Sequence, residues 1–251
     1  MSEVLRERPQ CSIVSPWLAQ AAVAAPALHG EHRADAIVVG GGYTGLSTAL
    51  ALRADGMRVI LLEGQTCGFG ASGRNAGHLT PTIGKDVPTL LRLFGKERTM
   101  RLVSLADTAI GEVERLMESH SIDCDYESVG NVIAAVHPKQ FAAVDRAADA
   151  ARVLGLPGAM LEPAEMQRRG LPRSFLRGFH ETHGGILDPG RYVAGLRRAV
   201  IDAGVELYEQ SPVLAVEDGS TPRVRTRDGS VTGELLVLGL NAYALGLRLP
   251  R

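Results

Sequence analysis

A glycine-rich turn between two apolar segments constrains the fold of this chain more than any other feature. Residues 36–39 form a short run without charge, typical of a strand buried on both faces of a parallel sheet. The run ends at Gly40, and the pattern then predicts a helix from Tyr43 that ends at Gly56. Residues 58–62 form a second apolar strand. This β-turn-α-β unit predicts an α/β fold.

The three glycines of the turn have the spacing GxGxxG, and each has a physical task. Gly40 makes the tight turn, Gly42 lets the main chain approach a pyrophosphate, and Gly45 lets helix and strand pack closely. Glu63 follows Gly45 by 18 positions (63 minus 45), close to the spacing of about 20 expected for an acid that hydrogen-bonds an adenosine ribose. The acid disfavours NADP but does not separate NAD from FAD. The alternative is a glycine-rich turn in an ordinary α/β protein.

The segment after the acid separates these two cofactors. Residues 64–80, GQTCGFGASGRNAGHLT, run on without a prompt second helix and are rich in Gly, Ser, Arg and Asn. Such a segment can lie along an extended ligand. Its amides and the side chains of Ser72, Arg74 and Asn75 suit a pyrophosphate, a ribityl chain and an electron-rich ring edge. The predicted cofactor is therefore FAD.

These motifs resemble those of the FAD-dependent amine and amino-acid oxidases, the group of glycine oxidase, sarcosine oxidase and D-amino-acid oxidase. The resemblance rests on VVGGGYTGLSTALAL, VILLE and CGFGASGRNAGH. It continues through SIDCDYESVGNVIAAV, GGILDPGRYVAGL and ELLVLGLNAYA, and so covers nearly the whole chain from about Trp17 onward. The gamma-glutamylputrescine oxidoreductase branch is the most similar. The fold implied is a Rossmann-type FAD-binding domain with an inserted α+β substrate domain.

The resemblance also implies a domain division. Residues 1–33 are expected to form an N-terminal arm, 34–84 and 184–251 the two parts of the FAD-binding domain, and 85–183 the substrate domain. Relatives continue far beyond Arg251, so the chain is expected to be a fragment whose C-terminal part is missing. Missing strands would leave sheet edges unpaired, and we expect poor solubility and weak flavin retention for this chain alone.

Functional positions are implied in the same way. Arg74 is the leading candidate for a charge near the flavin ring, and His78 for a pocket residue or a covalent attachment point. The alternatives are a structural Arg74 that pairs with a carboxylate or phosphate, and a His78 that is only a packed polar residue. Val213 is expected to offer its backbone to the adenine, although it is also simply a strand residue. The expected cofactor contacts are Gly40, Gly42, Tyr43, Thr44, Gly45, Glu63, Ser72, Arg74, Asn75, Val213 and Asn241.

The implied activity is oxidation of a C–N bond in a small amine or amino acid by hydride transfer to flavin, after which the imine is hydrolysed. Two other hypotheses stay open. One is a flavin dehydrogenase or tRNA-modifying relative of the same fold with another electron acceptor. The other is a non-catalytic remnant that binds only part of FAD. The sequence does not specify the amine, the acceptor or the oligomeric state.

Charge and cysteine usage exclude other classes of partner. The formal net charge is −1, without a long block of one sign, so neither a nucleic-acid footprint nor a polybasic membrane patch is predicted. The apolar stretch 12–28 is too short and too interrupted by proline to span a bilayer. Cys11, Cys67 and Cys124 are odd in number and lack a CxxC pair, which indicates free thiols in a reducing cytoplasm.

Periodicity outlines the remaining elements. His180, Glu181 and His183 are predicted to lie in a Gly-flanked loop without a third ligand at metal-site spacing, so no metal is expected. Two strands and several helices between the halves of the nucleotide domain indicate an insertion. The predicted helices are 96–120, 138–154 and 191–203, and the predicted strands are 130–136, 205–208, a small antiparallel meander of 213–217, 223–227 and 231–232, and a buried strand 235–238.

Overall fold

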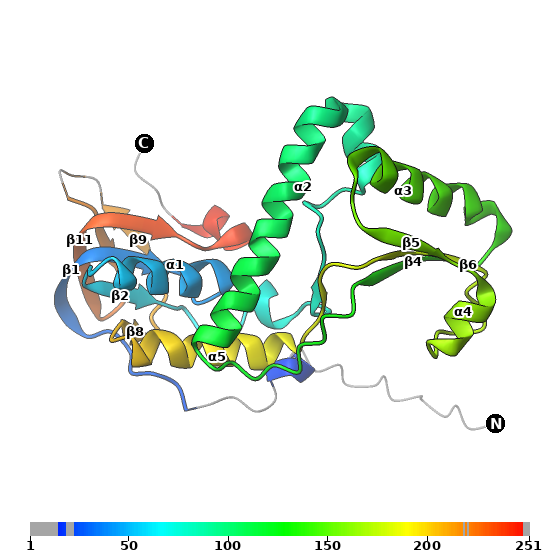
Figure 1. Ribbon diagram of the computed structural model, residues 1–251. Helices are drawn as coiled ribbons and strands as arrows, with labels where there is room; N and C mark the ends of the chain where they lie inside the picture. Colours follow the sequence, from blue (N-terminus) through cyan, green and yellow to red (C-terminus); the bar gives the residue numbers. More distant parts are fainter. Residues whose placement is uncertain (1–14, 19–22, 218, 220, 248–251) are drawn as a thin grey trace, which may run out of the picture. The chain divides into compact units, whose positions relative to one another are not determined.

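The computed structural model describes residues 15–18, 23–217, 219 and 221–247 (Figure 1). The chain divides into two compact units. The first unit comprises Met1–Asn75 and Pro189–Arg251, and the second unit comprises Ala76–Asp188. Cys11 and residues 1–14 and 19–22 of the predicted N-terminal arm lie outside the described residues. Among the described helices, none is long and apolar enough to cross a membrane.

The first unit is built on a six-stranded sheet with the order β8-β2-β1-β11-β10-β9. The strands β8, β2, β1 and β11 are parallel, and β11, β10 and β9 continue as an antiparallel meander. The bounds are β1 Gly30–Val39, β2 Val59–Leu62, β8 Glu206–Tyr208, β9 Ala215–Glu217, β10 Arg223–Arg225 and β11 Gly229–Leu238.

Two strands of this sheet are longer than the sequence pattern predicts. β1 begins at Gly30 because residues 30–34 pair in register with residues 229–233 of β11. Only its carboxyl end, 36–39, is buried on both faces, and this is the part that the apolar run revealed. β11 is one continuous strand, whereas the prediction split it into 231–232 and 235–238. The reason is the partner strand β1, which a local pattern does not show.

The carboxyl half of β11 is also less buried than predicted. The pattern suggested a strand enclosed on both faces, but Leu235 is 39% exposed and Leu238 is 36% exposed. Among the described residues, Leu235–Leu238 pairs with β1 on one side, and β10 reaches only the residues before it. The apolar composition of residues 235–238 therefore predicted the strand correctly, but the predicted burial on both faces was wrong.

Two helices of the first unit pack against each other, α1 (Tyr43–Ala54) and α5 (Pro189–Asp202). α1 buries Leu46, Ala49 and Leu50, as the sequence predicts. At its end the guanidinium of Arg53 donates through Nε to the backbone oxygen of Ala203, 2.9 Å away. This bond ties the end of α1 to the residue that follows α5.

The second unit contains a three-stranded antiparallel sheet with the order β4-β6-β5 (Figure 1). It also contains a separate antiparallel pair, β3 and β7. The bounds are β3 His78–Leu79, α2 Val87–Ser119, β4 Asn131–Ala135, α3 Phe141–Leu154, β5 Gly158–Leu161, α4 Pro163–Arg168, β6 Arg177–Glu181 and β7 Gly185–Ile186. Short 3-10 segments occupy Pro16–Leu18, Ala71–Gly73, Pro138–Gln140 and Asn241–Gly246.

Helix α3 covers one face of the three-stranded sheet. Phe179 of β6 and Ala135 of β4 are buried against the α3 residues Val144, Ala147 and Ala151. The long helix α2 begins at Val87, earlier than predicted, after Asp86 caps it by accepting a hydrogen bond from the Thr89 amide. It is interrupted at Gly95, whose φ of 71° is not helical, and the predicted helix begins after this break.

Four strands of the second unit were not predicted: the two-residue strands β3 and β7, and the longer β5 and β6. β5 is short and begins with glycine, and β6 has the sequence RGFHE, which lacks a β-branched residue. His180 and Glu181 therefore lie in a strand rather than in the predicted loop. β6 is a strand because it pairs with β4 and β5, whose residues are distant in the sequence. Glu181, for example, lies opposite Asn131.

Candidate functional site

The glycine turn after β1 has a geometry that only glycine allows at two of its positions. Gly40 has a φ of 110°, and a Cβ there would lie 2.6 Å from the backbone oxygen of Gly239. A Cβ at Gly45 would overlap the backbone oxygen of Gly40 and would touch Val38 of β1. Gly40 and Gly45 thus perform the turn and close-packing tasks predicted for them.

The amino end of α1 opens from this turn. Gly42 is its N-cap and has no side-chain cap, but the Tyr43 amide donates to the Oγ of Ser72 at 3.0 Å. A Cβ at Gly42 would lie 2.9 Å from the same Oγ. Thr44, the next residue, is exposed. Because the first amides of a helix carry a partial positive charge, this end of α1 suits a phosphate, and Ser72 adds a hydroxyl.

The loop that carries Ser72 is braced by its own polar side chains. Asn75 donates through Nδ2 to the backbone oxygens of Ala71 (3.1 Å) and Ser72 (2.9 Å). Arg74 donates through Nε to the oxygen of Phe69 at 2.7 Å, and its guanidinium lies over the Phe69 ring, 4.8 Å from the centroid. These contacts show Arg74 as part of the loop, and its predicted place near a flavin ring stays a prediction.

Glu63 lies where β2 ends, beside the glycine turn. Its Oε2 accepts a hydrogen bond from the Gly41 amide (2.7 Å), and its Oε1 accepts one from the Gln65 amide (2.8 Å). Burial raises the pKa of this carboxyl above its ordinary value, although the two amides oppose the rise. The carboxylate is held by backbone at the position that the fingerprint assigns to an acid that binds ribose.

A buried ion pair behind this loop was missed from the sequence. Glu209 is 1% exposed and accepts hydrogen bonds from Arg197 of α5 (2.9 Å) and from the amides of Cys67 (2.8 Å) and Ala25 (2.6 Å). Burial alone would raise the pKa of Glu209, but the bonds from Arg197 and the two amides outweigh burial and lower that pKa. Through its bond from the Cys67 amide, Glu209 fixes the start of the loop 64–75.

A sequence signal for this pair existed. Arg197 stands four residues after Val193 and three before Val200, on the inward stripe of α5. A basic residue on an apolar stripe needs a buried partner. That partner is Glu209, twelve positions later in the sequence, and only the folded structure identifies it.

Val213 and Asn241 are the remaining residues predicted to contact the cofactor. The Ser211 amide donates to the backbone oxygen of Glu63 (2.9 Å), which holds the segment before Val213 beside the end of β2. The Val213 side chain packs against the core around Ile60 and Leu62. Asn241 opens the last 3-10 segment with a φ of 47° and is exposed. It comes two residues after Gly239, which contacts the glycine turn. The glycine turn and Glu63 therefore meet at the carboxyl ends of β1 and β2, and Asn241 follows β11, the other strand that pairs with β1.

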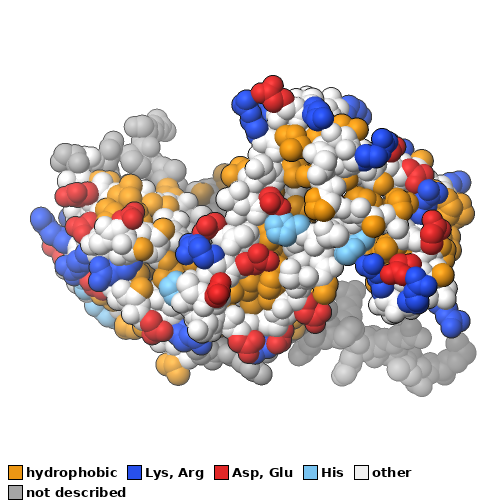
Figure 2. Space-filling model, in the orientation of Figure 1, with side chains coloured by type: hydrophobic (Ala, Val, Ile, Leu, Met, Phe, Trp, Pro, Cys, Tyr) orange, Lys and Arg blue, Asp and Glu red, His pale blue; other side chains and the backbone are white. Residues whose placement is uncertain are grey.

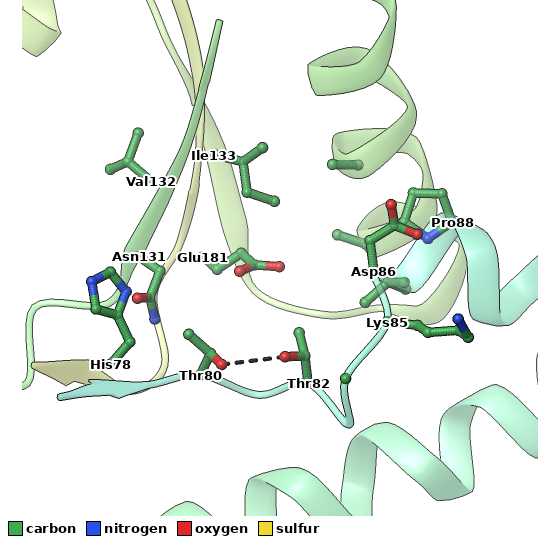
Figure 3. Close-up of a pocket in the computed structure, with 14 residues that line it drawn as sticks. His78, Thr80, Thr82, Lys85, Asp86, Pro88, Asn131, Val132, Ile133 and Glu181 are labelled. Carbon is green, nitrogen blue, oxygen red and sulfur yellow. Dashed lines mark hydrogen bonds between the residues drawn. The ribbon is translucent and has the colours of Figure 1, made fainter. Parts of the chain in front are cut away.

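His78 belongs to the second unit, in β3, where it pairs with Ile186 and is exposed. It lines a cavity of about 410 Å³ together with Thr80, Asn131 and Glu181 (Figure 3). Burial raises the pKa of the Glu181 carboxyl above its ordinary value. This cavity was not predicted, since Glu181 was assigned to a loop.

Acidic and basic side chains are interspersed on the face shown in Figure 2. Within the described ranges, no group of three or more His, Cys, Asp or Glu side chains is placed to hold a metal ion. His180 contacts the backbone oxygen of Val129 through Nε2 (2.9 Å), and His183 pairs with Asp107.

Comparison with known proteins connects this arrangement to a cofactor. Residues 35–250 match the family described as "DAO: FAD dependent oxidoreductase". The gamma-glutamylputrescine oxidoreductase of Escherichia coli (strain K12) is 32% identical over 210 residues, which are 83% of this chain and 49% of that protein. A protein of Haemophilus influenzae described as "Probable oxidoreductase OrdL" is 30% identical over 215 residues, 85% of this chain and 50% of that protein. The chain spans about half the length of these curated relatives.

Solved structures give the same picture. The crystal structure of glycine oxidase from Geobacillus kaustophilus superposes with a TM-score of 0.74 at 25% identity, over 86% of this chain and 57% of that chain. L-proline dehydrogenase from P. horikoshii superposes with a TM-score of 0.69, over 86% of this chain and 55% of that chain. Its identity of 17% shows a shared fold and no more.

Proposed function

The chain belongs to the family of FAD-dependent oxidoreductases, and we propose that it binds FAD and oxidises a C–N bond of a small amine or amino acid. The observation that carries the proposal is the assembly around the amino end of α1. There the glycine turn, the Glu63 carboxylate and the Ser72 hydroxyl meet at the carboxyl ends of two parallel strands. This is where open α/β sheets bind dinucleotides.

The residues present fit FAD in their chemistry. The amides at the start of α1 and the Ser72 hydroxyl would hold the pyrophosphate, and the Glu63 carboxylate would accept hydrogen bonds from the adenosine ribose. The backbone at Val213 would face the adenine. Gly42 has no Cβ and would let the phosphates approach the main chain. A Cβ there would also crowd the Ser72 hydroxyl. Tyr43, Thr44, Asn75 and Asn241 complete the proposed contacts.

When bound, FAD supplies an acceptor for the hydride on the carbon next to the amine nitrogen, and water then hydrolyses the imine that results. The protein's part is to bind, orient and exclude competing reactions. We propose Arg74 as a positive charge near the flavin ring and His78 as a residue of the substrate pocket. The second unit, which contains the whole of the predicted substrate domain 85–183, would supply that pocket.

The direct test is reduction of bound flavin by an amine. The chain would be loaded with FAD, excess flavin removed, and amines and amino acids added one by one without oxygen. Bleaching of the visible flavin absorbance by at least one of them is expected, with its recovery when air is admitted. A loaded protein that none of the amines bleaches would contradict the proposed reaction while leaving the cofactor assignment in place.

Arg74→Lys gives a sharper form of this test. The lysine keeps the charge but loses the planar fork, so slower bleaching with flavin still bound is expected. An unchanged rate would reduce Arg74 to the loop-bracing role seen in its contacts with Phe69. A cytoplasmic location also stays a prediction, supported by Cys67 and Cys124, which are both buried free thiols.

A further inference from the structure

The cavity of the second unit has an apolar wall and a polar wall. Ile133 of β4 and two alanines of α3, Ala147 and Ala151, form the apolar wall. The small side chains of the alanines leave the space of about 410 Å³ open. Glu181 and Thr80 stand on the polar side, and Figure 3 shows the Glu181 carboxylate pointing into the cavity. A ligand that fits both walls has a hydrocarbon part and a polar end.

The position of Glu181 follows from the strand register. It ends β6 and lies directly opposite Asn131 on β4 and Gly158 on β5. Since side chains alternate along a strand, Glu181 shares a face with Phe179, which belongs to the buried core under α3. Gly158 offers no side chain to cover the carboxylate. Glu181 therefore stands at the edge of an apolar core, facing open space.

This carboxylate has no compensating partner in the part of the chain that the structure describes. No hydrogen bond or ion pair joins it to another described residue, and the nearby charge that favours its ionised form is His180. A half-buried carboxylate without a partner is unfavourable, and burial raises its pKa. A cation bound in the cavity would relieve this penalty.

We propose that the cavity binds the ammonium group of an aliphatic amine, with Glu181 as counter-ion and with Ile133, Ala147 and Ala151 against the hydrocarbon chain. The inference rests on the proposed function, because it takes the substrate to be an amine. The ligand class of this cavity is thus a protonated aliphatic amine.

The other charged groups around the cavity support a cation. The Asp86 carboxylate lines the cavity, and its hydrogen bond from Thr89 lowers its pKa, so it is ionised at neutral pH. The basic residues of the lining are His78 and Lys85, and in Figure 3 the Lys85 side chain leads away from Glu181. An ammonium has three donors, and the Thr80 and Thr82 hydroxyls are further acceptors on the polar wall.

Calorimetric titration with n-butylamine hydrochloride at neutral pH tests the site, with butan-1-ol as the uncharged probe of the same chain length. The wild-type chain is expected to bind butylammonium at least tenfold more tightly than Glu181→Gln does. Butanol is expected to bind both proteins equally weakly. Glu162→Gln, which neutralises an exposed acid elsewhere in the same unit, is the matched control and is expected to bind like the wild type.

Equal affinity of wild type and Glu181→Gln for butylammonium, or no binding to the wild type, would overturn the inference. Circular dichroism of both variants checks that they are folded. Ethylamine and hexylamine test the apolar wall, since affinity should rise severalfold for each added methylene. An affinity independent of chain length would remove Ile133 and the alanines from the site.

An FAD titration of the same proteins separates this inference from the proposed function. Glu181→Gln is expected to bind FAD as the wild type does, because Glu63 and the glycine turn belong to the first unit. Amine binding without FAD binding would contradict the proposed function alone. FAD binding without amine binding would contradict the cavity assignment alone.

Discussion

Two glutamates at strand ends, one in each unit, show how differently a carboxylate can be placed. Glu63 follows β2 and Glu181 ends β6, both are partly buried, and burial raises the pKa of both. Glu63 is held by the amides of Gly41 and Gln65, whereas Glu181 has no such bond within the described residues. The Glu63 carboxylate is already hydrogen-bonded by backbone amides. The Glu181 carboxylate is free to bind the amine that we propose as its ligand.

The largest effect is expected at the glycine turn of the first region. In Gly45→Ala the new Cβ would overlap the Gly40 oxygen, which forces β1 and α1 apart. We expect a loss of about 3 kcal/mol in the free energy of unfolding, measured with urea, and loss of FAD binding. Gly111→Ala is the control, since nothing lies near a Cβ there; in mid-helix it should gain about 0.5–1 kcal/mol. Equal effects of the two substitutions would contradict the close-packing role of Gly45.

Next comes the buried pair behind the loop. Glu209→Gln leaves Arg197 without its counter-charge and should lower the free energy of unfolding by about 3 kcal/mol at neutral pH. The folded-state pKa of Glu209 lies below its unfolded value, so its contribution is present above the unfolded pKa and is lost as pH falls through the folded one. Urea unfolding at several pH values should therefore show wild type and variant converging in acid.

The exposed pair Arg58–Glu206 is the control for this prediction. Glu206→Gln should change the free energy of unfolding by less than about 1 kcal/mol, because water already screens the charges. A Glu209→Gln effect no larger than this would show that the pair does not hold the loop.

A smaller effect is expected at Glu63. Glutamine at this position has one acceptor oxygen, so either the Gly41 or the Gln65 amide loses its partner. Glu63→Gln should lower the free energy of unfolding by about 1 kcal/mol and weaken FAD binding. Unchanged stability together with unchanged FAD affinity would remove Glu63 from the site.

The smallest effect, of opposite sign, is expected at Glu181. The folded-state pKa of Glu181 lies above its unfolded value, so the charged carboxylate lowers stability above the folded pKa, and this penalty is absent below the unfolded one. Glu181→Gln should raise the free energy of unfolding at neutral pH by about 0.5 kcal/mol, and the gain should vanish in acid. A clear loss of stability at neutral pH would mean that Glu181 has a structural partner after all.

The sequence predicted the first region well because its contacts are local. β1, the glycine turn, α1, β2 and Glu63 follow one another within about thirty residues, and their order alone brings them together. The α/β fold and the resemblance to the FAD-dependent oxidases are confirmed by the family match and by the glycine oxidase structure. The roles of Arg74, His78 and the other predicted site residues stay predictions.

The second region was predicted less well because its contacts are distant in sequence. β6 is a strand since it pairs with β4 and β5, and its own residues, RGFHE, carry no alternating apolar pattern. Glu181 was therefore assigned to a loop, and the cavity it faces was not foreseen. Glu209 and Arg197 were missed for the same reason, since their pairing depends on how α5 packs beside β8.

Equilibrium titration of the purified chain with FAD and, in parallel, with NAD tests most directly whether the first unit forms an FAD site. We expect saturable, stoichiometric uptake of FAD with a perturbed visible spectrum, weaker uptake by Glu63→Gln, and no comparable binding of NAD. A folded chain that takes up no FAD, or that binds NAD in preference, would contradict the FAD site.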